Sequence, residues 1–109
     1  MRPWIVGCLV VAAVLEVGGD AFIRSGLRAR GLAFVVPGVV SLGIYGIVVN
    51  LVPWDFSKLL GVYVGVFAVV SVLCGRFVFG ENVPASTWLG LVIVIAGGLV
   101  IQLGPRLKW

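Results

Sequence analysis

The chain has 109 residues, of which 61% are hydrophobic and only 11% are charged, and its mean hydropathy is +1.24. A soluble domain of this length needs far more polar surface, so the composition excludes one. The net charge of +4 does not indicate a nucleic-acid partner, because the basic residues flank hydrophobic stretches and do not gather on one exposed domain. We therefore expect an all-α, multi-pass protein of the cell membrane.

Four hydrophobic stretches take up nearly the whole sequence. A helix needs about 20 largely apolar residues to cross the hydrocarbon core of a bilayer. Stretches of this kind lie at residues 3–23, 32–52, 58–79 and 86–104. The connections between them are too short to hold a soluble domain. The sequence therefore predicts a single transmembrane domain of four helices over residues 1–109.

Glu16 lies deep inside the first stretch, after a run of uncharged residues that extends from Trp4 to Leu15. A charge at membrane depth costs about 3 kcal/mol even on lenient insertion scales, so an intramembrane carboxylate marks a functional site by default. Asp20 follows four residues later on the same helical face, and Arg24 continues that stripe. We expect Glu16 to bind protons and a cation. Asp20 either joins this site or is neutralised by Arg24.

Small and polar residues near Glu16 predict a cavity beside its carboxylate. Small residues on the same face of the first helix would leave room for water or a ligand. Polar residues at depth in the second helix would add hydrogen-bonding groups. The expected cavity-lining residues are Ala12, Ala13, Gly19, Ser41 and Tyr45.

Tyr63 lies about one turn inside the third predicted helix. Its hydroxyl group can donate a hydrogen bond to a carboxylate, and its ring can face a cation. We expect it to belong to the proton and substrate site with Glu16. The alternative is a tyrosine that anchors the helix at the membrane interface.

Other chemistry is poorly represented in the sequence. The chain has no histidine, which excludes a histidine proton relay and a typical zinc site. No nucleophile, base and orienting group can be assembled from its residues into an enzyme site. We therefore expect no enzyme, no bound metal and no cofactor.

The basic residues are balanced between the two ends of the predicted helices. Four stand on the side of the termini and four on the opposite side: Arg2, Lys58, Arg106 and Lys108 against Arg24, Arg28, Arg30 and Arg76. Because the Lys and Arg difference between sides normally sets orientation, this balance predicts insertion in both directions. Two oppositely inserted copies would pair as an antiparallel homodimer. The alternative is an orientation that is set by something other than loop charge.

A dimer is also expected because four short helices can hardly enclose a polar cavity and still shield Glu16 from lipid. Small residues on the later helices would let two helix backbones approach closely. We expect the dimer interface on the fourth helix, with Gly61 and Gly65 of the third helix as the second candidate. The interface residues on the fourth helix are Gly90, Gly97 and Gly98.

Several motifs resemble the small multidrug resistance family of four-helix transporters. They are Leu15-Glu16-Val17-Gly18-Gly19, Arg24, Tyr63, Phe79-Gly80-Glu81 and Ala96-Gly97. Within the drug/metabolite transporter superfamily, the chain is most similar to the YnfA-like branch. The run from Pro53 to Lys58, followed by Tyr63-Val64-Gly65-Val66-Phe67, resembles that branch's proline-rich loop and tyrosine-glycine core.

The resemblance implies an antiparallel homodimer whose paired Glu16 carboxylates bind protons and a cationic substrate in competition. It also implies that Tyr63 is the ring partner of Glu16 and that Gly90 and Gly97 line the dimer seam. Val66 stands where the drug-exporting members have a tryptophan. A small cation is therefore a better expectation than a flat polyaromatic drug.

These features favour proton-coupled antiport of a small cation by alternating access. Burial disfavours the charged form of a carboxylate, and two carboxylates in one cavity titrate as a coupled pair. A cation stabilises the ionised form and expels protons, so either ligand can open the site to the other side. The alternatives are a lipid or lipid-carrier flippase, which would need a basic residue in the cavity, and a non-transporting partner subunit, which would not need Glu16.

The balance of basic residues predicts that a tag at the carboxyl terminus reports both sides of the membrane. Two lysines added to one loop should shift the population toward one orientation, because the side richer in Lys and Arg stays in the cytoplasm. Reporter fusions that are active on only one side of the membrane measure the two populations. A single orientation for the unmodified chain would favour a parallel dimer.

Overall fold

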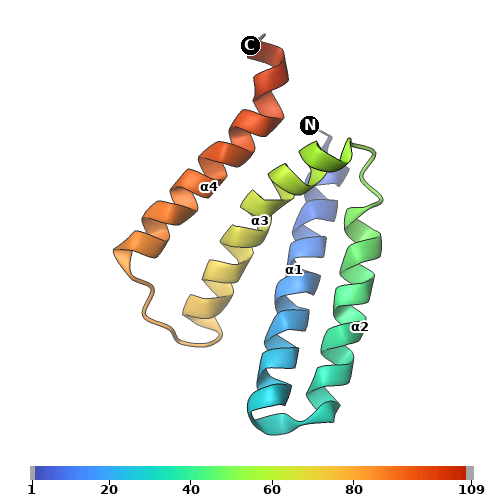
Figure 1. Cartoon of the computed structure of the whole chain (residues 1–109), viewed down its shortest axis with the longest axis vertical. Helices are drawn as coiled ribbons and strands as arrows, with labels where there is room; N and C mark the ends of the chain where they lie inside the picture. The colour runs from blue at the N-terminus through green and yellow to red at the C-terminus, as the bar shows by residue number, and fades with distance from the viewer. Residues whose placement is uncertain (1, 108–109) are drawn as a thin grey trace. The chain divides into compact units, whose positions relative to one another are not determined.

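The computed structural model describes residues 2–107, and the described part of the chain forms helices without any strand. Each of the four long helices is long and apolar enough to cross a membrane, which confirms the predicted all-α, multi-pass class. Lys108 of the charge balance lies outside the described residues. The helices are α1 (Pro3–Ser25), α2 (Leu32–Val49), α3 (Phe56–Phe77) and α4 (Ala85–Leu103) (Figure 1).

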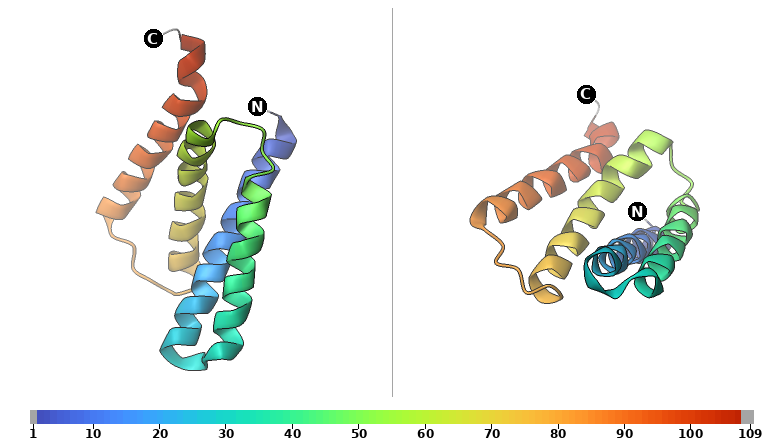
Figure 2. Two further views of the ribbon diagram at one scale, coloured as in Figure 1. Left: turned by 45° about the vertical axis from the view of Figure 1, so that its right-hand side comes forward. Right: turned by 60° about the horizontal axis from the view of Figure 1, so that its bottom comes forward.

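The chain divides into two compact units, Met1–Pro53 and Trp54–Trp109. The first is an antiparallel hairpin in which α1 packs against α2. The second is a hairpin of α3 and α4. Within each hairpin, the two helices lie side by side in both views of Figure 2. Short connections give this arrangement, because a helix that leaves the membrane and re-enters after a few residues must run back beside its predecessor.

The largest departure from the sequence prediction is at the end of α1. Residues 24–31 were expected to form a connection, but α1 continues to Ser25 and then into a π-helix, η1 (Gly26–Arg30). Nothing in this segment breaks a helix before Gly31, whose positive φ of 73° stops it and whose N–H donates to the Gly26 carbonyl at 2.8 Å. The arginines of this segment therefore stand on helical turns.

The remaining helix ends differ from the prediction by one to three residues. The second helix ends at Val49, not at residue 52, because Asn50 turns back and donates from its side-chain amide to the Gly46 carbonyl at 2.7 Å. The third helix begins at Phe56, not at residue 58, directly after Asp55. The fourth continues into a 3-10 helix, η2 (Gly104–Leu107). Hydropathy alone cannot locate such ends, because they depend on local hydrogen bonds.

The crossing of α1 and α2 depends on two glycines. A Cβ atom on Gly19 would lie 2.9 Å from the Gly38 carbonyl oxygen, and one on Gly38 would lie 2.7 Å from the Gly19 carbonyl oxygen. The backbones of the two helices therefore touch at this point. Pro37, inside α2, directly precedes Gly38. Proline has no N–H to give the preceding turn, so α2 lacks one backbone hydrogen bond beside the crossing.

Glycines also lie at the contact between α3 and α4. A Cβ atom on Gly61 would meet the Ile101 side chain at 2.6 Å. A Cβ atom on Gly98 would lie 3.9 Å from the Val62 carbonyl oxygen, and one on Gly65 would lie 3.9 Å from the Val94 carbonyl oxygen. The glycines of this pair thus serve the packing of one hairpin, in which α3 and α4 approach less closely than α1 and α2 do.

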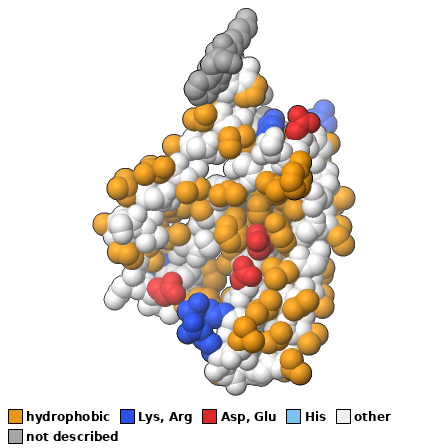
Figure 3. All heavy atoms as spheres, in the orientation of Figure 1, with side chains coloured by type: hydrophobic (Ala, Val, Ile, Leu, Met, Phe, Trp, Pro, Cys, Tyr) orange, Lys and Arg blue, Asp and Glu red, His pale blue; other side chains and the backbone are white. Residues whose placement is uncertain are grey.

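The surface is largely hydrophobic. Side chains of Leu27, Leu32 and Phe77 are each about three-quarters exposed, and many valines and isoleucines are half exposed. Figure 3 shows hydrophobic side chains over much of one face, with few acidic or basic groups among them. A soluble monomer rarely exposes apolar surface on this scale, whereas lipid covers it in a membrane protein.

The Gly19 and Gly38 crossing predicts that Gly38→Ala destabilises the first hairpin. The added methyl group has no space, so the helices must separate, at a cost of about 1–3 kcal/mol. Gly43→Ala, on the same helix with nothing within 4 Å of its Cβ position, should change the stability by less than about 1 kcal/mol. Unfolding of the purified protein by titration with a denaturing detergent measures both. Equal effects of the two substitutions would contradict the close crossing.

Candidate functional site

Glu16 lies near the middle of α1 and is partly buried. It stands one helical turn before Gly19, the residue at which α1 touches α2. This places its side chain next to the crossing, where α2 can supply groups to it. Tyr45 stands on α2, so the hairpin brings Glu16 and Tyr45, two of the predicted site residues, into one compact unit.

Ser41 connects α2 to the backbone beside Glu16. Its hydroxyl oxygen lies 2.7 Å from the carbonyl oxygen of Leu15 and donates a hydrogen bond to it. Ser41 follows Gly38 by three residues and Tyr45 follows Ser41 by four, so all three share one face of α2. The serine therefore fixes the register of the two helices at the level of the carboxylate.

The small residues predicted to line a cavity are closely packed in the single chain. Ala12 and Ala13 have no exposed surface, and Leu9 on the same face is 1% exposed. Gly19 is buried against α2. Their place on the inner face of α1 agrees with the predicted stripe. Whether they line a cavity in an assembly stays a prediction.

Asp20 differs from Glu16 in its surroundings. Its side chain is exposed and forms no ion pair or hydrogen bond with the described part of the chain. The pairing with Arg24, one of the two expectations for this residue, stays a prediction. Asp20 is left available to a ligand or to water.

Tyr63 belongs to α3, in the second hairpin. Only 3% of its surface is exposed, and its ring packs against Phe67 with the centroids 6.2 Å apart. The expectation of an interfacial anchor is not tested by this packing and stays a prediction. Its predicted partnership with Glu16 stays a prediction.

The three glycines assigned to the dimer interface occupy two different environments. Gly98 is buried and faces the backbone of α3 within the same hairpin. Gly90 and Gly97 have nothing within 4 Å of their Cβ positions. Open space beside these two glycines is what the approach of another helix requires.

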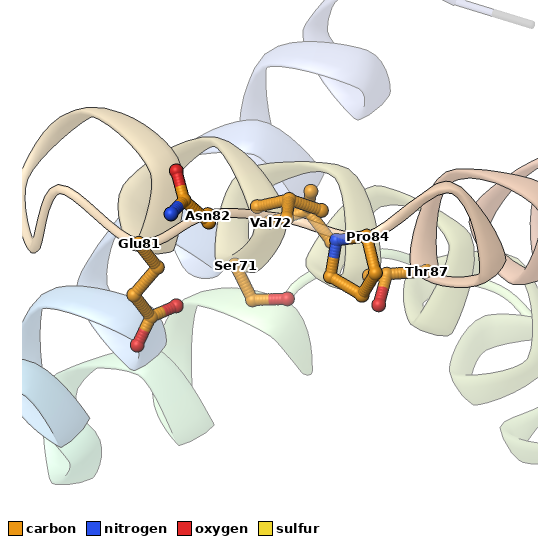
Figure 4. Close-up of a pocket in the computed structure, with 7 residues that line it drawn as sticks. Ser71, Val72, Glu81, Asn82, Pro84 and Thr87 are labelled. Atoms are coloured by element: carbon orange, nitrogen blue, oxygen red, sulfur yellow. The ribbon is translucent and has the colours of Figure 1, made fainter.

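A second polar region escaped the sequence reasoning. A pocket of about 200 Å³ lies where α3, the following loop and α4 meet, and its polar lining residues are Ser71, Glu81, Asn82 and Thr87 (Figure 4). From the sequence, Glu81 is predicted only as part of the Phe79-Gly80-Glu81 motif, not as a binding group. The signal was the position of a carboxylate directly after Gly80, a glycine that can reverse the chain.

Comparison with known proteins identifies the family. A family model described as "Uncharacterised BCR, YnfA/UPF0060 family" matches residues 5–107. The chain belongs to the YnfA/UPF0060 family. This confirms the predicted YnfA-like branch, while membership of the wider small multidrug resistance group stays a prediction. No solved structure matches the chain.

Relatives of this family match along most of the chain. A UPF0060 membrane protein of Mycobacterium marinum is 38% identical over 99 residues, which cover 89% of this chain and 90% of the relative. One from Saccharopolyspora erythraea is 40% identical over the same shares of the two chains. One from Kineococcus radiotolerans is 34% identical and covers 93% of each chain. Their names and the spanning helices identify a multi-pass membrane protein.

The Ser41 hydrogen bond predicts that Ser41→Ala weakens the pairing of α1 and α2. Interhelical hydrogen bonds in membranes contribute about 0.6 kcal/mol on average and at most about 1.7 kcal/mol, so the loss should fall in this range. Ser71→Ala should have a smaller effect, because the Ser71 hydroxyl group bonds to Ala68 of its own helix. The same detergent titration compares the two variants. A larger loss for Ser71→Ala would contradict the inferred role of Ser41.

Proposed function

We propose that this YnfA/UPF0060 protein is a proton-coupled antiporter that exports a small cation, with Glu16 as the shared binding site. The observation that supports the proposal is a partly buried carboxylate in the middle of a membrane-spanning helix, beside polar groups of the neighbouring helix. Such a group is costly in lipid and is retained where protons or ions must bind.

The chemistry of Glu16 suits alternating occupation by two ligands. A carboxylate can bind one proton or attract one cation, and each ligand excludes the other electrostatically. Binding of either ligand then favours a protein that turns toward the side where that ligand is released. The result is an exchange of protons for cations without a cofactor.

The polar groups of α2 support this role. Tyr45 stands on the same face of α2 as Ser41, and Ser41 holds the helix backbone beside the carboxylate. A phenol can donate a hydrogen bond to an ionised carboxylate and can accept a hydrogen bond from an ammonium or guanidinium group. The pair Glu16 and Tyr45 thus offers one charge and one adaptable hydroxyl group to a small cation.

The proposed working unit is an antiparallel homodimer. One copy exposes hydrophobic side chains on every helix, and the open positions at Gly90 and Gly97 on α4 fit a second helix. Two copies would bring two Glu16 carboxylates to one cavity, where they would titrate as a coupled pair. Tyr63 would then complete the site as an aromatic partner for the cation.

This function predicts that Glu16→Gln abolishes transport and the release of protons on cation binding, while the fold and dimerisation persist. The amide has nearly the same shape as the carboxylate and can still form hydrogen bonds, but it carries no charge for either ligand. A survey of small guanidinium and quaternary ammonium compounds, read out as proton release from purified protein in weakly buffered detergent, measures the effect.

Asp20→Asn is the matched control for this experiment. Asp20 lies one turn from Glu16 on the same helix, but it is exposed. Its loss should reduce proton release by less than the loss of Glu16. If Glu16→Gln still released protons and Asp20→Asn did not, the binding carboxylate would be Asp20.

A further inference from the structure

The connection between α3 and α4 holds a carboxylate in a defined position. Gly80 has a positive φ of 65° and reverses the chain after α3. The N–H of Glu81 then donates to the Gly75 carbonyl oxygen at 3.0 Å. The Glu81 carboxylate oxygen Oε1 occupies the position that a Cβ atom on Gly75 would need. The loop thus folds Glu81 back over α3 at Gly75, which has no side chain.

Hydroxyl groups surround the pocket beside this carboxylate. Ser71 comes from α3 and Thr87 from the first turn of α4. In the view of Figure 4, their oxygens and the Glu81 carboxylate point to the same side of the loop, while the Asn82 side chain points away. Ser71 donates to the Ala68 carbonyl oxygen, so its hydroxyl oxygen remains free to accept a hydrogen bond.

The Glu81 carboxylate is not committed to a partner in the protein. It forms no ion pair or side-chain hydrogen bond with the described residues. Acceptor oxygens around one negative charge select a cation that carries N–H or O–H donors. No group of three metal-ligating residues occurs in the described part of the chain, so a tightly held metal ion is not favoured.

We propose that the Glu81 pocket is a capture site for small organic cations with N–H donors, such as guanidinium or primary ammonium compounds. A pocket of about 200 Å³ holds several water molecules at about 30 Å³ each, which is enough for a compound of this size. This inference rests on the proposed transport function, because the pocket would capture the cations that the Glu16 site exports. The pocket lies at a helix connection, where a cation from solution arrives first, and it is open enough to release the cation again.

The test uses methylguanidinium as the probe and full-length protein in lipid nanodiscs. Saturation-transfer NMR of the methyl protons reports binding, and proton release reports the Glu16 site separately. In the Glu16→Gln background, which removes the proposed central site, the probe should still bind weakly. Adding Glu81→Gln should reduce that affinity by up to about fivefold, the upper end of what an accessible ion pair contributes.

Two further variants separate a built pocket from general surface charge. Gly75→Ala keeps the Glu81 charge but displaces the carboxylate, so it should also weaken probe binding. Asp55→Asn removes an exposed carboxylate from the connection between α2 and α3 and should leave binding unchanged. Circular dichroism and size-exclusion chromatography show whether each variant remains folded. Equal affinity with and without Glu81, or an equal loss with Asp55→Asn, would overturn the proposal.

The two proposals fail in distinguishable ways. Probe binding that depends on Glu81 without any proton release would sustain the pocket and reject Glu16 antiport. If the same probe concentration released protons from the unmodified protein and from the Glu81→Gln variant, the capture role of the pocket would be rejected. A final measurement compares nanodiscs with and without phosphatidylethanolamine. If this lipid displaced the probe, its ammonium headgroup would be the occupant of the pocket, and the proposal of a soluble cation would be overturned.

Discussion

The contact between the backbones of Gly19 and Gly38 decides the geometry of the first hairpin. Dispersion forces and hydrogen bonds, not the hydrophobic effect, hold helices together in lipid, and both require short distances. With no side chain between them, α1 and α2 come close enough for the Ser41 hydroxyl group to reach the Leu15 carbonyl at 2.7 Å. The position of Glu16 beside α2 follows from that approach.

The polar groups of this protein are placed where packing can offset their cost. Glu16 is one turn from the helix crossing and is partly buried there. Apolar residues such as Ala12 and Ala13 fill the same inner face. The inner face of α1 beside Glu16 is therefore closely packed in the single chain.

Glu81 shows a different way of holding a charge. It lies in a loop, is accessible to water, and is positioned by a backbone hydrogen bond and by the absence of a side chain on Gly75. An exposed carboxylate of this kind attracts cations only weakly. Glu16, in contrast, is partly buried inside a membrane-spanning helix, where an ionised carboxylate is costly. In the proposed function, the accessible carboxylate of Glu81 and the partly buried carboxylate of Glu16 would bind a cation one after the other.

The amino-acid sequence alone determined the class of protein and the number of spanning helices, and it singled out Glu16 as the candidate site residue. Hydropathy locates a membrane span because lipid accepts no unpaired backbone, and Glu16 stands out because a charge is rare there. The sequence also placed Ser41 and Tyr45 at depth, although it could not say which backbone group Ser41 would reach. Only the tertiary structure decided that α1 continues through a π-helix, that Gly98 packs inside the α3 and α4 hairpin while Gly97 remains open, and that Glu81 folds back over Gly75. These features depend on which atoms of distant segments meet. Composition and periodicity describe one helix at a time and do not specify contacts between helices.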